Sequence, residues 1–297
     1  MRSKIVVVVG PNASGKSEFA IRLAKKINGE VISADSRQVY KGLDIGSGKI
    51  TKKEMRGVRH HCLSIANPKK IFTALDFKKC SEQAIANILS RDKTPIIVGG
   101  TGFYIDVALG RIKLGGVPPN HALRKKLAKK SAAELYKILK KLDPKRAKII
   151  EQKNPRRLVR AIEIALVNKP QTKFRSLIDL NLVWGKIIWF GIKRPPEKLK
   201  KRIRARLLKR LSGIIREVKK LHTAPPAGGG LSWKRLFDLG LEYRYVSLYL
   251  RGKLSKDDMV RQLEIAIWHY AKRQMTWFKR NKKIRWISNP KSLPIFL

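Results

Sequence analysis

The chain has 297 residues, of which 68 are Lys or Arg and 21 are Asp or Glu, giving a net charge of +47. This length allows a large core in one or two domains, and no apolar run approaches the ~18 residues of a membrane span. So large a positive surplus repels itself in a compact protein unless a polyanion screens it. Nucleic acid is such a polyanion, and a proteome-wide Lys/Arg bias is the alternative explanation.

Two cysteines, Cys62 and Cys80, are present, and neither belongs to a C-x-x-C pair. A zinc site is therefore not expected. The basic N-terminus is followed by an apolar run of only Ile5–Val9, which is too short for a secretion signal. These features predict two unpaired thiols in a reducing cytoplasm.

Strands and helices alternate over the first hundred residues. Apolar runs predict strands at Ile5–Val9, Glu30–Ser33, His61–Ile65 and Pro95–Val98. Helical patterns lie between them at Glu18–Ile27 and Leu75–Ser90. The alternation predicts an α/β fold of the P-loop type, with a parallel sheet covered by helices on both faces.

The pattern changes after Gly115–Pro119. Ala122–Val167 has helical periodicity, with Pro144 and Pro155 placed where helices can begin. The polar stretch Asn168–Asn181 follows as a connector. We therefore expect an all-helical insertion over residues 113–181, between the two parts of a catalytic core at 1–112 and 182–297.

Strand character returns at Lys186–Ile192. A long basic helix is predicted over Glu197–Leu221, with Leu199, Ile203, Leu207 and Leu211 forming a stripe that faces the core. The loop Ala224–Gly230 is rich in Pro and Gly. Two more helices are predicted, at Trp233–Leu250 and Lys256–Lys279.

One motif lies between the first predicted strand and its helix: Gly10, Pro11, Asn12, Ala13, Ser14, Gly15, Lys16 and Ser17. Its form, G-x-x-x-x-G-K-S, and its position are those of a phosphate-binding P-loop. Glycines let backbone N–H groups turn toward phosphate oxygens, Lys16 adds a positive charge, and the Ser17 hydroxyl can ligate Mg²⁺. The motif does not identify the reaction, because a P-loop can hold a nucleotide or a diphosphate that leaves.

Two polar side chains follow other predicted strands. Asp35 comes just after Glu30–Ser33, and Thr101 follows Pro95–Val98 within Gly99–Tyr104. Both residues should therefore lie at the edge of the sheet formed by the carboxyl ends of the strands, where ligands of parallel α/β sheets bind. An Asx turn is the alternative role for Asp35, and an ordinary strand-to-helix turn is the alternative for Thr101.

These elements, in this order, resemble the tRNA dimethylallyltransferases, also called tRNA isopentenyltransferases. The segments that carry the resemblance are Gly10–Ser17, Asp35–Tyr40, Leu43–Gly46, His61 with Asp76 and Phe77, Gly99–Tyr104, Asn154–Glu163 and Lys272–Phe278. The run D-S-R-Q-V-Y behind a P-loop is highly specific for this family. The chain departs from the family pattern at Gly46–Lys49, which usually reads G-T-A-K, and at Leu239–Tyr243, where the family usually has Ile-Gly-Tyr.

The resemblance implies transfer of a dimethylallyl group from its diphosphate to N6 of the adenosine directly 3′ of the anticodon (position 37) in tRNA. It implies that Asp35 is the general base, that Thr101 lies beside the transfer point, and that Arg202 and Arg206 bind the diphosphate together with the P-loop and Mg²⁺. The residues that it implies contact tRNA are Asp35, Ser36, Arg37, Gln38, Thr101, Arg124, Arg156, Arg157, Arg160, Lys272, Arg273 and Gln274. The target base must leave its stack to reach such a site.

Three alternatives remain. Transfer to free AMP uses the same fold, although the basic surface argues against it. A small-molecule kinase needs a carboxylate after a strand, and Ile96–Val98 is followed by glycines. A non-catalytic RNA-binding protein would not need Lys16, Ser17, Asp35 and Thr101. We expect a cytoplasmic monomer that binds tRNA and dimethylallyl diphosphate, with no membrane partner.

Overall fold

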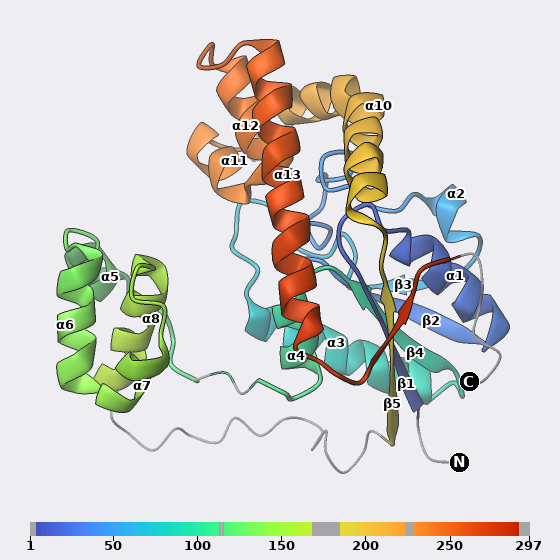
Figure 1. Ribbon diagram of the computed structural model, residues 1–297, viewed down its shortest axis with the longest axis horizontal. Coiled ribbons are helices and arrows are strands. Elements are labelled where there is room, and N and C mark those ends of the chain that lie inside the picture. The colour runs from blue at the N-terminus through green and yellow to red at the C-terminus, as the bar shows by residue number, and fades with distance from the viewer. Residues whose placement is uncertain (1–3, 113, 115, 168–184, 224–228, 291–297) are drawn as a thin grey trace. The chain divides into compact units, whose positions relative to one another are not determined.

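The computed structural model describes residues 4–112, 114, 116–167, 185–223 and 229–290 (Figure 1). The chain divides into two compact units, one formed by Met1–Ile112 with Ile178–Leu297 and the other by Lys113–Leu177. The predicted connector Asn168–Asn181 and most of the predicted loop Ala224–Gly230 lie outside the described residues.

The first unit is built on a six-stranded sheet whose order is β3-β2-β4-β1-β5-β6, with every neighbouring pair parallel. The strands are β1 (Lys4–Val9), β2 (Gly29–Ala34), β3 (His60–His61), β4 (Thr94–Gly99), β5 (Lys186–Ile192) and β6 (Ile284–Ile287). Central β1 is fully buried from Val6 to Val9, as a sheet covered on both faces requires. The predicted fold class is therefore confirmed.

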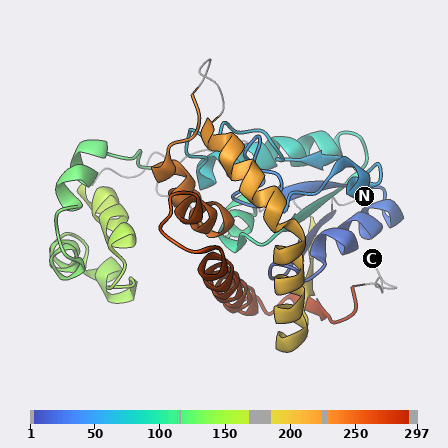
Figure 2. The same cartoon turned by 90° about the horizontal axis from the view of Figure 1, so that it is seen from above.

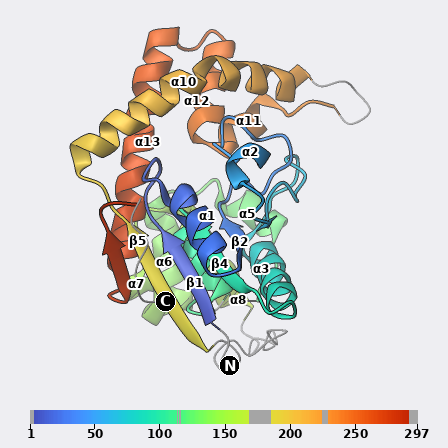
Figure 3. The same cartoon turned by 90° about the vertical axis from the view of Figure 1, so that its right-hand side faces the viewer.

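Helices cover the two faces of the sheet. Phe19 and Leu23 of α1 (Lys16–Lys26) pack against Val6 and Val8 on one face, and Figure 3 shows α1 in front of the sheet. On the other face, α3 (Ala74–Leu89) and α4 (Gly102–Ala108) pack against the alternate residues of the same strands. A short helix, α2 (Lys52–Met55), lies in the connection from β2 to β3.

Four helices gather beyond the carboxyl ends of the strands (Figures 1 and 2). They are α10 (Pro196–Thr223), α11 (Trp233–Leu239), α12 (Leu241–Leu250) and α13 (Lys256–Lys279). Leu199, Ile203 and Leu207 are buried in a core that this helical layer shares with Val39 and Leu43. The predicted apolar stripe thus faces a core, although Leu211 is only partly buried. The packing places the helical layer over the edge of the sheet where ligands bind.

Two local predictions were wrong, and one strand was not predicted. The helix predicted over Trp233–Leu250 breaks at Gly240, whose φ of 76° and ψ of −179° are not helical. The strand predicted over His61–Ile65 is limited to His60–His61, because Cys62 and Ser64 have positive φ. Strand β6 was not predicted. It is short, and its apolar residues are interrupted by Arg285 and follow the basic stretch Lys279–Lys283.

Cys62 and Cys80 form a disulfide, with their Cα atoms 6.2 Å apart. The prediction of two unpaired thiols is therefore wrong. Cys62 follows β3 and Cys80 lies on α3, so the fold brings together two residues whose spacing in the sequence gives no pairing signal. None of the described helices is long and apolar enough to cross a membrane.

The second unit is a small helical bundle. Its helices are α5 (His121–Leu127), α6 (Ala132–Leu142), α7 (Pro144–Ile149) and α8 (Pro155–Leu166). Pro144 and Pro155 occupy the first turns of α7 and α8, as predicted. Leu127, Leu139 and Leu158 are buried in a core that belongs to this unit alone, although Ile149 and Leu166 are exposed.

Candidate active site

The P-loop turns from the end of β1 into α1. Gly15 has a φ of 99°, a left-handed conformation that side chains disfavour, and a Cβ on Gly10 would lie 2.8 Å from the carbonyl oxygen of Ile192. Both glycines are thus required by the close turn. The loop directs the N-terminus of α1, with its free N–H groups, at the edge of the sheet, which suits an anion.

Lys16 lies at the start of α1, with its Nζ 3.4 Å from the carbonyl oxygen of Pro11. Burial lowers the pKa of the Lys16 ammonium to about 8, while Asp35 opposes this shift and Arg206 reinforces it. Ser17 is more exposed and lines the same cavity. A bound anion would offset the free-energy cost of removing the lysine ammonium from water.

Three arginines contact the P-loop from other elements. Arg194 donates to Ser14 O at 3.1 Å, Arg202 to Ala13 O at 2.9 Å and Arg206 to Asn12 Oδ1 at 2.9 Å. Burial lowers the pKa of Arg206, and the negative charges of Glu242 and Asp35 partly offset this decrease. Sequence reasoning found Arg202 and Arg206 but missed Arg194. It directly follows β5, where the strand-end rule used for Asp35 would have found it.

Asp35 lies just past β2, and the two oxygens of its carboxylate differ in their hydrogen bonding. Oδ1 accepts the backbone N–H groups of Arg37 at 2.8 Å and Gln38 at 3.2 Å, which is an Asx turn. Oδ2 has no hydrogen bond to any residue that the structure describes, and Asp35 lines the cavity. The turn and the functional role are therefore compatible, because the turn fixes one oxygen and leaves the other for a ligand.

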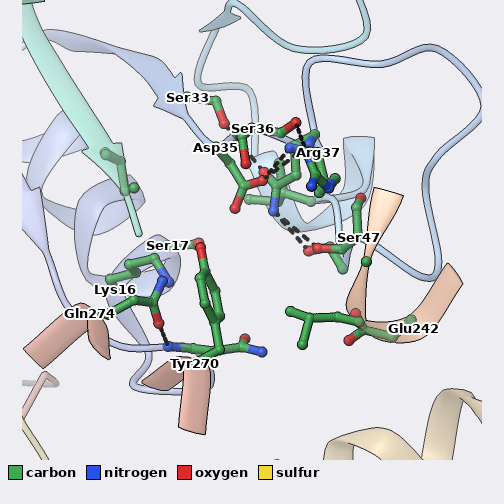
Figure 4. Close-up of a pocket in the computed structure, with 18 of the residues that line it drawn as sticks. Lys16, Ser17, Ser33, Asp35, Ser36, Arg37, Ser47, Glu242, Tyr270 and Gln274 are labelled. Atoms are coloured by element: carbon green, nitrogen blue, oxygen red, sulfur yellow. Dashed lines mark hydrogen bonds between the residues drawn. The ribbon is translucent and has the colours of Figure 1, made fainter. Parts of the chain in front are cut away.

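Thr101 lies behind the wall of the cavity. Its Oγ1 accepts the N–H of Ser36 at 3.2 Å, and it is hydrogen-bonded to the hydroxyl of Tyr270, whose ring lies in the cavity (Figure 4). Burial, with a contribution from Asp35, raises the pKa of Tyr270 to about 12, so the phenol stays neutral and can donate. Tyr270 was not predicted as a site residue.

Gln274 of α13 joins two of the predicted motifs. Its Oε1 accepts the N–H of Asn12 at 2.8 Å, and its Nε2 donates to Gly100 O at 3.0 Å. A side chain at Gly100 would collide with this amide. Gln274 is 6% exposed, so the polar atoms that sequence reasoning assigned to tRNA are used inside the protein.

The other predicted contacts near the cavity are less enclosed. Arg37 donates to Leu239 O at 2.5 Å, and Gln38 donates to Gly48 O at 3.3 Å. Arg273 is exposed and lines the cavity, whereas Lys272 is exposed beside the ring of Trp268. Arg273 thus reaches the site directly.

A carboxylate on α10 holds the loop that closes one side of the site. Glu217 accepts the N–H groups of Asp44, Ile45 and Gly46 at 2.9, 2.6 and 3.0 Å. The Tyr243 hydroxyl donates to the same carboxylate at 2.9 Å and accepts from Ser47 N at 3.0 Å. Sequence reasoning missed both residues, because the loop residues that they contact lie more than 170 positions away.

These groups surround one cavity of about 310 Å³ (Figure 4). The predicted residues that line it are Asn12, Lys16, Ser17, Asp35, Ser36, Arg37, Gln38, Arg206, Arg273 and Gln274. The cavity therefore joins a cationic side at the P-loop to a carboxylate at the end of β2. Thr101 adjoins it through Ser36 and Tyr270, and Arg202 contacts the outer side of the P-loop.

The remaining predicted residues belong to the second unit. Arg124 contacts both oxygens of buried Glu163 at 2.7 and 2.8 Å, and Arg160 donates to Glu163 at 3.0 Å. Arg157 lies 3.4 Å from Glu151, while exposed Arg156 has no ion pair within the described residues. Arg124 and Arg160 therefore hold the bundle together, and Arg156 and Arg157 are the most available of the four.

An all-parallel sheet with a P-loop, an adjacent carboxylate and converging arginines defines an α/β protein of the P-loop type. The sequence model of one family, described as IPP transferase, matches residues 38–281. The chain belongs to this family, which confirms the resemblance seen in the motifs.

Individual relatives cover nearly the whole chain. It is 41% identical to tRNA dimethylallyltransferase 2 of Treponema denticola over 95% of both chains. It is 38% identical to tRNA dimethylallyltransferase 1 of Geotalea uraniireducens over 97% of this chain and 93% of that one. Among solved structures, a tRNA isopentenylpyrophosphate transferase of Bacillus halodurans matches with a TM-score of 0.68 at 33% identity, covering 97% of this chain and 90% of that one. A eukaryotic dimethylallyltransferase acting on tRNA matches with a TM-score of 0.79 at 25% identity, covering 96% and 74%.

Proposed function

We propose that this protein transfers a dimethylallyl group from dimethylallyl diphosphate to N6 of the adenosine directly 3′ of the anticodon in tRNA. The observation that carries the proposal is the cavity itself. It is lined by Lys16 and Arg206, which suit a diphosphate, and by Asp35, whose Oδ2 is available to a nucleophile. The names of the relatives support the same reaction.

Asp35 is the general base in this proposal. The N6 amine of adenine is a poor nucleophile because its lone pair is delocalised into the ring. As the C–N bond forms, Oδ2 takes a proton from the amine, and the C–O bond breaks with its electron pair leaving on the diphosphate. The N–H groups of Arg37 and Gln38 hold Oδ1, so the carboxylate is oriented before the substrate arrives.

The P-loop side stabilises the charge that develops on the leaving group. The N-terminus of α1, Lys16 and Arg206 converge there in a partly enclosed site, where each interaction is stronger than in water. Burial is the main cause that lowers the pKa values of Lys16 and Arg206, and repulsion by Arg206 lowers that of Lys16 further. A diphosphate relieves that repulsion.

Mg²⁺ is the metal that this donor set suits. The described residues contain no group of three or more His, Cys, Asp or Glu side chains that could hold a metal. The ion would therefore depend on the Ser17 hydroxyl and on diphosphate oxygens, which matches the preference of Mg²⁺ for few protein ligands and several waters. When bound, it neutralises part of the diphosphate charge.

The tRNA is recognised, in this proposal, by both units. Arg37 and Arg273 line the cavity, and exposed Arg156 and Arg157 offer phosphate contacts on α8. A tRNA substrate supports a cytoplasmic location. Because one chain carries every group that the reaction uses, a monomer is sufficient.

The test is incubation with dimethylallyl diphosphate, Mg²⁺ and bulk tRNA, followed by mass spectrometry of the nucleosides. We expect a dimethylallyl adenosine from tRNA and little product when AMP replaces tRNA. A parallel reaction with ATP and no prenyl donor tests for phosphoryl transfer, which should be absent. Binding of tRNA without any prenylated adenosine would overturn the proposal.

A further inference from the structure

A second carboxylate, Glu242, lines the same cavity as Asp35. It is the second residue of α12, and the break at Gly240 places the start of that helix at the cavity wall. Only 7% of Glu242 is exposed. Figure 4 shows it across the cavity from Lys16 and Ser17. The reaction described above gives it no role.

Glu242 has no close partner on the arginines that it faces. Its Oε1 lies 4.0 Å from an Arg210 nitrogen, well beyond the ~2.7–2.9 Å of a charge-assisted hydrogen bond. Arg210 instead donates to Ile45 O at 2.7 Å and to Arg206 O at 3.2 Å. Glu242 therefore acts on these groups through its charge.

Arg206 connects this carboxylate to the P-loop. One of its terminal nitrogens donates to Asn12 Oδ1 at 2.9 Å and the other to Gly48 O at 3.2 Å. Burial lowers the pKa of Arg206, and Glu242 is the strongest charge opposing that shift. Burial raises the pKa of Glu242, while a hydrogen bond from its own backbone N–H and the charges of Arg210 and Arg206 oppose that rise. The three side chains thus form one electrostatic group beside the phosphate site.

We propose that Glu242 is a positioning residue that balances Arg206 and Arg210 in the empty site and weakens the hold of Arg206 on diphosphate, so that the product leaves. This inference rests on the proposed function. Before substrate binds, Glu242 is the strongest opposite charge acting on both Arg206 and Arg210. Once diphosphate occupies the P-loop, the two anions compete for Arg206 and repel each other, and in a partly enclosed site this repulsion weakens diphosphate binding by about tenfold.

The test compares Glu242→Gln with the unmodified protein in the dimethylallyl transfer reaction, using inorganic diphosphate as the inhibitor. Glutamine keeps the shape and removes the charge. We expect the inhibition constant for diphosphate to fall about tenfold, the KM for dimethylallyl diphosphate to fall with it, and kcat to decrease because release is slower. Glu242→Asp keeps the charge and should restore most of the original inhibition constant.

Glu264→Gln is the matched control. Glu264 pairs with Arg204 at 2.8 Å on the outer side of α10 and α13 and does not line the cavity, so its replacement should leave the inhibition constant unchanged. Should Glu242→Gln fail to fold, Glu242→Ala removes the same charge and carries the same expectation.

An unchanged or larger inhibition constant in a folded, charge-free variant would overturn the role of Glu242. If Glu242 had a purely structural role, its replacement would lower kcat and the melting temperature without strengthening diphosphate binding. If the unmodified protein neither transfers the prenyl group nor binds diphosphate, the proposed function fails instead, so the two failures are distinguishable.

Discussion

Gln274 accepts the backbone N–H of Asn12 at 2.8 Å across 262 residues of sequence. The same side-chain amide donates to Gly100 O at 3.0 Å. Helix α13 therefore fixes the distance between the P-loop and the end of β4, where Thr101 begins the next turn. The geometry of the P-loop therefore depends on a residue from the last of the described helices.

Replacing Gln274 with Leu should weaken both stability and diphosphate binding. The variant leaves the partly buried N–H of Asn12 and the buried carbonyl of Gly100 without this partner, and a buried unpaired polar group costs about 1–3 kcal/mol. We expect lower stability in urea unfolding and a higher KM for dimethylallyl diphosphate. The control is Thr276→Ala, two residues away on the exposed side of α13. A Gln274→Leu protein with unchanged KM but weaker tRNA binding would instead indicate that the amide contacts tRNA.

Asp35→Asn should abolish transfer while leaving the fold intact. Asparagine keeps an oxygen that can accept the N–H groups of Arg37 and Gln38, so the turn after β2 is retained, but it cannot take the proton from the amine. We expect kcat to fall by roughly 10²–10⁴, with tRNA affinity measured by filter binding within about twofold. Turnover close to that of the unmodified protein would show that Asp35 is not the base.

The motifs that lie directly behind strands were predictable because a parallel sheet brings the carboxyl ends of its strands to one edge. That rule is sufficient to predict that the P-loop, Asp35 and Thr101 lie at the same edge of the sheet. It gives no information on Glu217, Glu242 or Tyr270, which reach the site from helices whose periodicity reveals only their buried face. The disulfide between Cys62 and Cys80 was missed for the same reason, since it depends on how α3 packs beside β3.

Glu217→Gln should loosen the loop at the side of the cavity. The carboxylate accepts three backbone N–H groups, from Asp44 to Gly46, and a neutral amide accepts hydrogen bonds about half as strongly. We expect hydrogen exchange at these three amides to become faster by about tenfold or more, and kcat/KM to fall. Glu197→Gln, an exposed residue at the start of the same helix, is the control. Unchanged exchange at the three amides would contradict the role of Glu217.

Glu163 should make the second unit sensitive to acid. Burial raises the pKa of its carboxyl, but hydrogen bonds from Arg124, Arg160 and the N–H of Asn120 outweigh that effect and bring the pKa down to about 2. The unfolded value is about 4.3. Because the folded pKa is the lower one, the stabilisation is complete above the unfolded pKa and is lost as the pH falls from about 5 to about 2.

The size of this effect is about 2 kcal/mol, allowing for solvent screening at the half-exposed arginines. Hydrogen exchange of α8, corrected for the intrinsic effect of pH, should therefore be slower in the unmodified protein than in Glu163→Gln at pH 7, and the difference should vanish near pH 2. Glu151→Gln, which breaks an exposed pair with Arg157, should change exchange little at either pH. A difference between Glu163→Gln and the unmodified protein that persisted unchanged at low pH would mean that the buried ion pairs do not set the stability of the bundle.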